Sequence, residues 1–369
     1  MLARPIKLQA LSGHYSTEDA INSTLKERAT GISGRRHVCL FVSELFLYGF
    51  VMPPVSFLLD IFGANTLFAA DDSAGALRSV VVEGSEKRRA ILILGMHRSG
   101  TSALTRTVNL LGAATPQTLM GATSGNLRGH WESKPIVDLN DEILAACGHR
   151  WYSRRPIAVS PSEVVRANGM WQRLRDTLES EFDGASTVVL KDPRISRLVP
   201  LYREALAEAG YGVEALLTLR NPLEVAQSLA RRDDMEPRRA LGVWMRYTLD
   251  AERGTRGLPR ALVVYEDLLA DWRGTTDRMK QQLGGHWPEM TPEVAATIDE
   301  FLTPTLRHHT IEVPKSGLGR TAIAGLLYRD FARRLVERPS ATPGLLAVAL
   351  AECSLRAGRA SSGRVPAPA

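Results

Sequence analysis

The chain has 369 residues, of which 44% are hydrophobic and 23% are charged, and its formal net charge is +6. This composition excludes a disordered or fibrous protein and allows one large domain with a substantial core. The basic residues are spread along the chain without a block of lysine and arginine interleaved with aromatics. We therefore expect no nucleic-acid partner and interpret the charge as favouring small phosphorylated ligands.

The cysteines and histidines are too far apart in the sequence to predict a disulfide framework or a metal centre. The three cysteines, Cys39, Cys147 and Cys353, are odd in number and far apart, which predicts no disulfide framework and a cytoplasmic, reducing location. The only adjacent histidines, His308 and His309, have no cysteine or aspartate cluster beside them. We therefore predict no metal site.

Residues 1–88 differ in pattern from the rest and are expected to form an N-terminal extension. An apolar segment spans 38–70, but its longest charge-free run, residues 45–59, is shorter than the ~20 residues that cross a bilayer. A cleaved signal peptide also fits poorly, because the run begins after nearly forty mixed residues. An apolar arm packed on the main domain, or a poorly ordered extension, is preferred over a membrane anchor.

From residue 89 onward, short aliphatic runs alternate with amphipathic stretches. AILIL (90–94), STVVLK (186–191), VEALLTL (213–219) and ALVVY (261–265) are typical of buried parallel strands. This alternation predicts an α/β domain over 89–338, with a mainly parallel sheet and flanking helices in a three-layer architecture like that of P-loop nucleotidases. A C-terminal helix and a small-residue tail are expected over 339–369.

Helices are expected between and after these strands. Two have specific start patterns: Ser160-Pro161 supplies an N-cap and a first-turn proline, and Asn221-Pro222-Leu223-Glu224 adds a glutamate at the third position. The expected ranges are 101–112, 135–147, 161–182, 195–209, 222–232, 235–253, 273–283 and 292–302.

The stretch GMHRSGTS (95–102) follows the first strand directly and precedes the first helix. Its Gly-x-x-x-x-Gly spacing is that of a phosphate-binding loop, but Thr101 and Ser102 stand where nucleotide-hydrolysing loops continue with lysine. Backbone N–H groups and a helix N-terminus converge at such a turn, which favours an anion. Arg98, Ser99, Thr101 and Ser102 can add side-chain donors.

A second basic segment, LRNPLEVAQS, ends the third strand. Arg220 closes the strand and Ser228 lies about two turns along the following helix. Since ligands of open α/β sheets gather at the carboxyl ends of the strands, Arg220 is expected on the same rim as the glycine loop. The two segments together predict two separate phosphate clamps for one ligand.

With LKDPR (190–194) and YEDLLADW (265–272), these two segments resemble the sulfotransferase family that uses 3′-phosphoadenosine-5′-phosphosulfate (PAPS). The resemblance covers residues 89–285, in order. It implies PAPS as sulfate donor and a hydroxylated acceptor, such as a carbohydrate, a lipid or a small molecule. It does not account for the first 88 or the last 80 or so residues.

Carried over residue by residue, the resemblance assigns the 5′-phosphosulfate to the loop and the 3′-phosphate to Arg220 and Ser228. The implied loop residues are Gly95, His97, Arg98, Ser99, Gly100, Thr101 and Ser102. Arg98 stands where many members have lysine, so it is expected to stabilise charge and not to donate a proton. His97 beside it is a candidate proton donor.

The acceptor hydroxyl needs a base, and the segment NLRGHWESKPIVDLNDEIL (126–144) offers several. Glu132 is preferred because it lies just before a helix, where a carboxylate can face the rim. The alternative for Glu132 is an acidic residue that only stabilises the helix dipole. His130 is the second candidate base, and Asp141 and Glu142 fit a helix face better.

Four further residues are candidates for the acceptor site. Trp131 and Trp151 offer aromatic faces that suit a sugar, although aromatics over a core are equally ordinary. Lys191 and Arg194 follow the second strand and are expected to line the sulfate or acceptor site.

Two other functions stay open from the sequence. One is a magnesium-dependent kinase or nucleoside triphosphatase with a degenerate loop, for which Asp192 would be the strand-end metal ligand. The other is a sulfotransferase-like binding protein without catalysis.

Overall fold

The computed structural model describes residues 88–122, 129–303, 311–312 and 319–336, together with 338, 339, 348, 351 and 355. The chain divides into two units, Met1–Val81 and Val82–Ala369, and every described residue belongs to the second. The apolar segment 38–70 and the tail after 355 therefore lie outside the described residues, and the expectations for them stay predictions.

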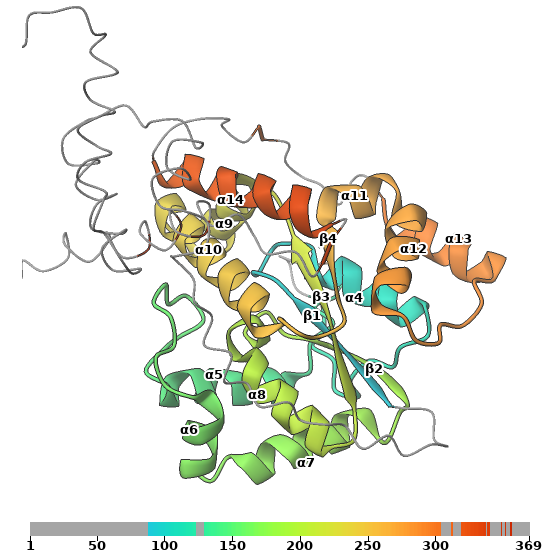
Figure 1. Ribbon diagram of the computed structural model, residues 1–369, viewed down its shortest axis with the longest axis horizontal. Helices are drawn as coiled ribbons and strands as arrows, with labels where there is room; N and C mark the ends of the chain where they lie inside the picture. Colours follow the sequence, from blue (N-terminus) through green and yellow to red (C-terminus); the bar gives the residue numbers. More distant parts are fainter. Residues whose placement is uncertain are drawn as a thin grey trace, which may run out of the picture. The chain divides into compact units, whose positions relative to one another are not determined.

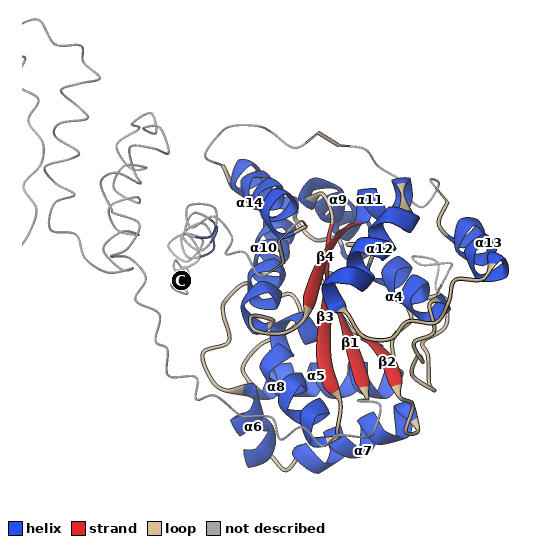
Figure 2. Cartoon of the chain, turned by 45° about the vertical axis from the view of Figure 1, so that its right-hand side comes forward, coloured by secondary structure: helices blue, strands red, loops and turns tan. Residues whose placement is uncertain are grey.

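Four parallel strands form the sheet, in the spatial order β2-β1-β3-β4 (Figures 1 and 2). They are β1 (Arg89–Leu94), β2 (Thr187–Lys191), β3 (Gly212–Leu219) and β4 (Arg260–Val264). The register pairs Ile91 of β1 with Val189 and with Glu214. All four predicted strands are confirmed.

Helices cover both faces of this sheet, so the predicted α/β, three-layer architecture is confirmed. The helices are α4 (Thr101–Leu110), α5 (Lys134–Ala146), α6 (Pro161–Ala167), α7 (Trp171–Phe182), α8 (Ile195–Glu208), α9 (Pro222–Asp233), α10 (Pro237–Gly254), α11 (Tyr265–Ala270), α12 (Trp272–Leu283), α13 (Pro292–Phe301) and α14 (Arg320–Leu335). In both views α4, α12 and α13 lie on one side of the sheet, and α8 and α10 lie on the other.

The strands are apolar on both faces because both faces are covered. Ile91 and Ile93 of β1 pack into one core with Val189, Leu216 and helix residues of α4 and α12. The alternate residues Ala90, Leu92 and Leu94 are equally buried. Continuous aliphatic runs such as AILIL are what this double burial requires.

The predicted secondary structure needs three corrections: one helix range, one strand end and two helices that were not expected. The range 161–182 is two helices, because Gly169 adopts a left-handed φ of +68° between α6 and α7. Tyr265 was expected to end the last strand, but β4 ends at Val264 and Tyr265 begins the short α11. Neither α11 nor α14 was among the expected helices.

The order of the strands creates a switch point between β1 and β3. The chain leaves β1 toward β2 on one side, and it leaves β3 toward β4 on the other. In open α/β sheets the loops diverge at such a point and leave room for a ligand at the carboxyl ends of the strands. The loop after β1 and the residue Arg220 after β3 meet there.

Gly100 at the start of α4 cannot accept a side chain, because its φ is +87° and an added Cβ would lie 2.1 Å from Cδ2 of Tyr265. We expect Gly100→Ala to lower the free energy of unfolding by roughly 2–4 kcal/mol through left-handed strain and overlap combined. Urea denaturation measures the change.

Gly210→Ala is the matched control, since Gly210 has a φ of +82° with nothing within 4 Å of an added Cβ. It should cost only about 1 kcal/mol. Equal losses in the two variants would contradict the close contact between Gly100 and Tyr265.

Candidate active site at the switch point

The loop between β1 and α4 is tightly folded at the carboxyl edge of the sheet. Gly95 and Gly100 have φ values of +151° and +87°, and Arg98 between them is also left-handed at +69°. Ser196 clamps the loop start, since its Oγ accepts a hydrogen bond from Gly95 N at 2.9 Å. Gly100 is the N-cap of α4 and has no side chain to cap the first N–H groups of the helix.

Two buried polar atoms of this loop lack a partner in the described structure. They are Oγ of Ser99, a residue only 1% exposed, and Nε2 of His97, a residue 9% exposed. A buried polar atom without a hydrogen bond is costly, so such atoms collect where a ligand supplies the partner. Together with the helix N-terminus, they make the loop a fitting site for an oxyanion.

The second predicted segment meets this loop directly. Nε of Arg98 donates to Oγ of Ser228 on α9 at 2.8 Å, and Nη1 of Arg220 donates to the main-chain oxygen of Arg98 at 3.2 Å. Residues more than 120 positions apart are thus joined by two hydrogen bonds. The structure brings together Arg98, Arg220 and Ser228.

Two residues that the sequence analysis did not assign to the site hold Arg220 in place. Nε and Nη2 of Arg220 both donate to Oε2 of Glu224 at 3.0 Å, and the guanidinium lies 4.7 Å from the ring centre of Tyr265. Glu224 was interpreted as a helix-capping glutamate, but the capping is done by Asn221, whose side chain accepts from Leu223 N. The four-residue spacing from Arg220 to Glu224 was the available clue.

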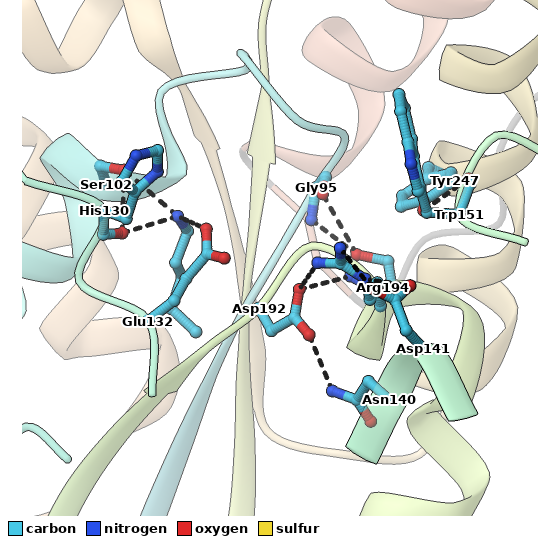
Figure 3. A network of polar contacts seen from close by, with 12 residues as sticks. Gly95, Ser102, His130, Glu132, Asn140, Asp141, Trp151, Asp192, Arg194 and Tyr247 are labelled. Atoms are coloured by element: carbon cyan, nitrogen blue, oxygen red, sulfur yellow. Dashed lines mark hydrogen bonds and ion pairs between the residues drawn. The ribbon is translucent and has the colours of Figure 1, made fainter. Parts of the chain in front are cut away.

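Lys191 at the end of β2 is the centre of a second polar cluster, whose other members Ser102, His130 and Glu132 are labelled in Figure 3. Its Nζ donates to the carboxylate of Glu132, to the main-chain oxygen of His130 at 2.8 Å and to Oγ of Ser102 at 3.2 Å. Ser102 also donates to the oxygen of His130 at 3.1 Å. Lys191 therefore fixes Glu132, the predicted base, beside the first turn of α4.

Arg194 takes part in a different network. It donates to both oxygens of Asp141 at 2.8 and 2.9 Å and to Asp192 at 3.0 Å, while Asn140 donates to the other oxygen of Asp192 at 2.8 Å. Burial raises the pKa of Asp192, and the Arg194 guanidinium opposes that shift. This network ties α5 to the start of α8, and in the view of Figure 3 Asp192 lies between Glu132 and Arg194.

His97 is a neutral imidazole in this setting. Burial lowers its pKa well below the usual value, and the nearby charges of Arg194, Arg232, Lys191 and Arg98 lower it further. At neutral pH His97 can share a hydrogen bond with a ligand, but it carries no surplus proton to donate. This argues against the role of proton donor that the sequence suggested.

The two candidate tryptophans have different neighbours. Trp151 contacts His97 edge to face, with ring centres 5.0 Å apart. Trp131 has a left-handed φ of +57°, and Arg106 of α4 lies 4.9 Å from its ring. The second candidate base, His130, is half-buried, and burial lowers the pKa of its imidazole.

None of the helices that the structure describes has the length and apolar character needed to cross a membrane. Within the same residues, no three His, Cys, Asp or Glu side chains come together in a way that could hold a metal ion.

Comparison with known proteins gives structural similarities only. No protein-family model and no curated protein sequence matches the chain. The sulfotransferase domain of the Synechococcus PCC 7002 olefin synthase is 18% identical, with a TM-score of 0.34, covering 68% of this chain and 96% of that domain.

Two further solved structures are similar. The sulfotransferase domain of the curacin biosynthetic pathway is 15% identical, with a TM-score of 0.35, over 74% of this chain and 99% of its own. A sulfotransferase of Mycobacterium tuberculosis H37Rv is 18% identical, with a TM-score of 0.32, over 57% and 70%.

The lowered pKa of His97 predicts a pH dependence of stability. Below pH about 6.5 the unfolded chain binds a proton on His97 that the folded protein excludes. The free energy of unfolding therefore decreases as the pH is lowered, by at most about 1.4 kcal/mol per pH unit. Urea denaturation between pH about 7.5 and 5.5 should show a shallower fall for His97→Gln. Parallel curves for the two proteins would contradict the buried, neutral imidazole.

Proposed function

We propose that this protein is a sulfotransferase that moves a sulfuryl group from PAPS to an acceptor hydroxyl. The observation that carries the proposal is the position of Arg98, which contacts both Ser228 and Arg220. Two anion-binding segments on neighbouring strands are joined at the switch point. A nucleotide with phosphates at both its 5′ and its 3′ position is the ligand that needs such a pair.

The loop residues fit the 5′ end of this donor. Ser99 Oγ and His97 Nε2 are buried without partners, and the N-terminus of α4 has no side-chain cap. Each can contact an oxyanion at the end of β1. Thr101, in the position of the nucleotidase lysine, adds no charge, and Arg98 brings the positive charge three residues earlier.

Arg220 and Ser228 are assigned to the 3′-phosphate. Glu224 and Tyr265 hold the Arg220 guanidinium from two sides, so it is ordered before the ligand binds. Such preorganisation lowers the entropic cost of binding. Ser228 accepts a hydrogen bond from Arg98 and keeps its own hydroxyl proton for a phosphate oxygen.

The donor supplies an activated sulfuryl group, and the protein supplies position, charge and a base. Glu132, fixed by Lys191, accepts the proton of the acceptor hydroxyl as a new bond forms between that oxygen and sulfur. The bond from sulfur to the 5′-phosphate oxygen breaks, and Arg98 stabilises the charge on the leaving phosphate. The products are a sulfate ester, adenosine 3′,5′-bisphosphate and a proton that passes from Glu132 to water.

Two observations weigh against a magnesium-dependent kinase or triphosphatase. Thr101 replaces the loop lysine that contacts the terminal phosphates. Asp192, the metal ligand such an enzyme would need, already accepts hydrogen bonds from Arg194 and Asn140. We therefore prefer the transferase without a nucleotidase metal.

The 3′-phosphate assignment predicts how nucleotide affinity responds to substitution. Calorimetry with adenosine 3′,5′-bisphosphate should give a micromolar Kd, which Ser228→Ala and Arg220→Lys each weaken by roughly 10-fold, because a hydroxyl donor or the guanidinium fork is lost. Arg220→Lys keeps a positive charge beside the buried Glu224, which protects the fold.

Ser180→Ala, at an exposed position of α7, is the control and should leave the Kd unchanged. The assignment would be refuted if millimolar bisphosphate gave no heat. A preference for ATP with magnesium over the bisphosphate would support the kinase alternative instead.

The base assignment predicts a loss of turnover without a loss of binding. With labelled PAPS and 4-nitrophenyl glycosides as acceptors, Glu132→Gln should lower kcat by roughly 10²–10⁴-fold, since the amide cannot accept the proton. Its bisphosphate affinity should match that of the unaltered protein.

Asp138→Asn, in the same segment but exposed and paired with Lys134, is the matched control and should keep full activity. Undiminished turnover in Glu132→Gln would reject Glu132 and leave His130 as the base to test. Retained bisphosphate binding without sulfate transfer by the unaltered protein would indicate a binding protein.

A further inference from the structure

The segment from Trp151 to Arg155 connects the phosphate loop to the start of α10. The Trp151 ring lies 5.0 Å from His97 and 5.4 Å from Tyr152. Tyr152 in turn lies 4.8 Å from the guanidinium of Arg239, in the first turn of α10. We call the rings of Trp151 and Tyr152 the aromatic row. It extends from His97 in the phosphate loop to Arg239 at the start of α10.

Buried groups hold the backbone of this segment rigid. Tyr247 donates to the oxygen of Trp151 at 2.8 Å, Arg197 donates to the oxygen of Ser153 at 2.8 Å, and Arg246 donates to that of Arg154 at 3.3 Å. The side chains of Arg197 and Arg246 are completely buried and share Asp250. The rings and guanidinium groups of the segment are thus presented on a fixed backbone.

Arginines gather where this segment meets α10 and α14. Arg154 passes so close to α10 that a Cβ added to Gly242 would lie 2.6 Å from its Cδ. Nη1 of Arg320 donates to the main-chain oxygen of Arg238 at 3.1 Å. Burial lowers the pKa of Arg320, the nearby charges of Arg154 and Arg238 lower it further, and Glu236 opposes the shift.

We define the arginine band as Arg154, Arg232, Arg238, Arg239 and Arg320. Arg232 extends it toward the phosphate loop, since its guanidinium lies 5.8 Å from the Trp151 ring. Its members come from the 151–155 segment and from α9, α10 and α14. The band therefore borders the aromatic row along its length.

Asp233 and Glu236 are the carboxylates next to the band, and they do not form salt bridges with three of its arginines, Arg154, Arg238 and Arg239, within the described residues. Glu236 is committed to the N-terminus of α10, where it accepts from Arg238 N at 2.9 Å and from Arg239 N at 2.8 Å. Asp233 pairs with Arg232. Within the described part of the chain, no carboxylate lies within salt-bridge distance of Arg154, Arg238 or Arg239. Like charges held this close repel one another, and an anion would relieve the repulsion.

Building on the proposed function, we propose that the acceptor is an acidic carbohydrate, bound through its ring by Trp151 and Tyr152 and through its anionic group by the arginine band. Aromatic faces suit sugar rings, and guanidinium forks suit carboxylate or sulfate oxygens. His97 has Trp151 on one side and the charge of Lys191, the partner of Glu132, within range. Trp151 thus joins the two aromatic rings to the loop that is assigned to the sulfuryl donor.

The test compares two probes that differ only at C6, 4-nitrophenyl β-D-glucuronide with a carboxylate and 4-nitrophenyl β-D-glucoside with a neutral hydroxymethyl group. Calorimetry on the full chain, with and without saturating adenosine 3′,5′-bisphosphate, measures the binding of each probe without turnover. We expect the glucuronide to bind roughly 10-fold more tightly, because its carboxylate gains charge-assisted hydrogen bonds.

Substitution of the band should remove this preference selectively. The double variant Arg154→Gln/Arg238→Gln should reduce it to less than about 3-fold while leaving the bisphosphate Kd unchanged, which also reports an intact fold. Arg175→Gln, an exposed arginine on α7, is the control and should keep the full preference.

Equal binding of the two probes, a preference that survives the double variant, or no binding of either probe would overturn the proposal. Failure of the proposed function gives a different result. In that case the bisphosphate does not bind, whereas an arginine-dependent preference for the glucuronide persists without nucleotide and identifies the band as an anion site of its own.

Discussion

Arg98 is the residue on which the arrangement of the site depends. It adopts a left-handed conformation in the loop after β1, so its main-chain oxygen faces Arg220 while its side chain reaches Ser228. A non-glycine residue in this conformation costs free energy, which the two hydrogen bonds offset. Through Arg98 the loop after β1 and the start of α9 form one continuous surface, which is the proposed nucleotide site.

Charges around this surface are paired before any ligand arrives. Lys191 holds Glu132, Glu224 holds Arg220, and Asp141 and Asp192 hold Arg194. A buried pair contributes little net stability, but it keeps each group in one position. Catalysis by positioning and charge stabilisation needs this fixed geometry, because side chains that are already ordered do not have to reorganise during the reaction.

The sequence predicted the strands and the meeting of the two polar segments at one edge of the sheet well, and the helix boundaries and side-chain partners less well. Aliphatic runs such as AILIL have one stable environment, a sheet covered on both faces, so their position follows from composition. The division between α6 and α7 depends on one glycine, Gly169, and the short α11 begins at a tyrosine that resembles the end of a strand. Both are local choices that a hydrophobic pattern does not resolve.

The four strands, the glycine loop and the spacing of Arg220 and Ser228 can be read from the sequence, because they depend on local pattern. Which charged groups meet depends on the packing of the fold. The fold pairs Lys191 with Glu132, lowers the pKa of His97 through burial, and brings the arginine band together from four segments. Such contacts depend on the packing of distant elements, and a residue's pKa and partners follow from its surroundings in space.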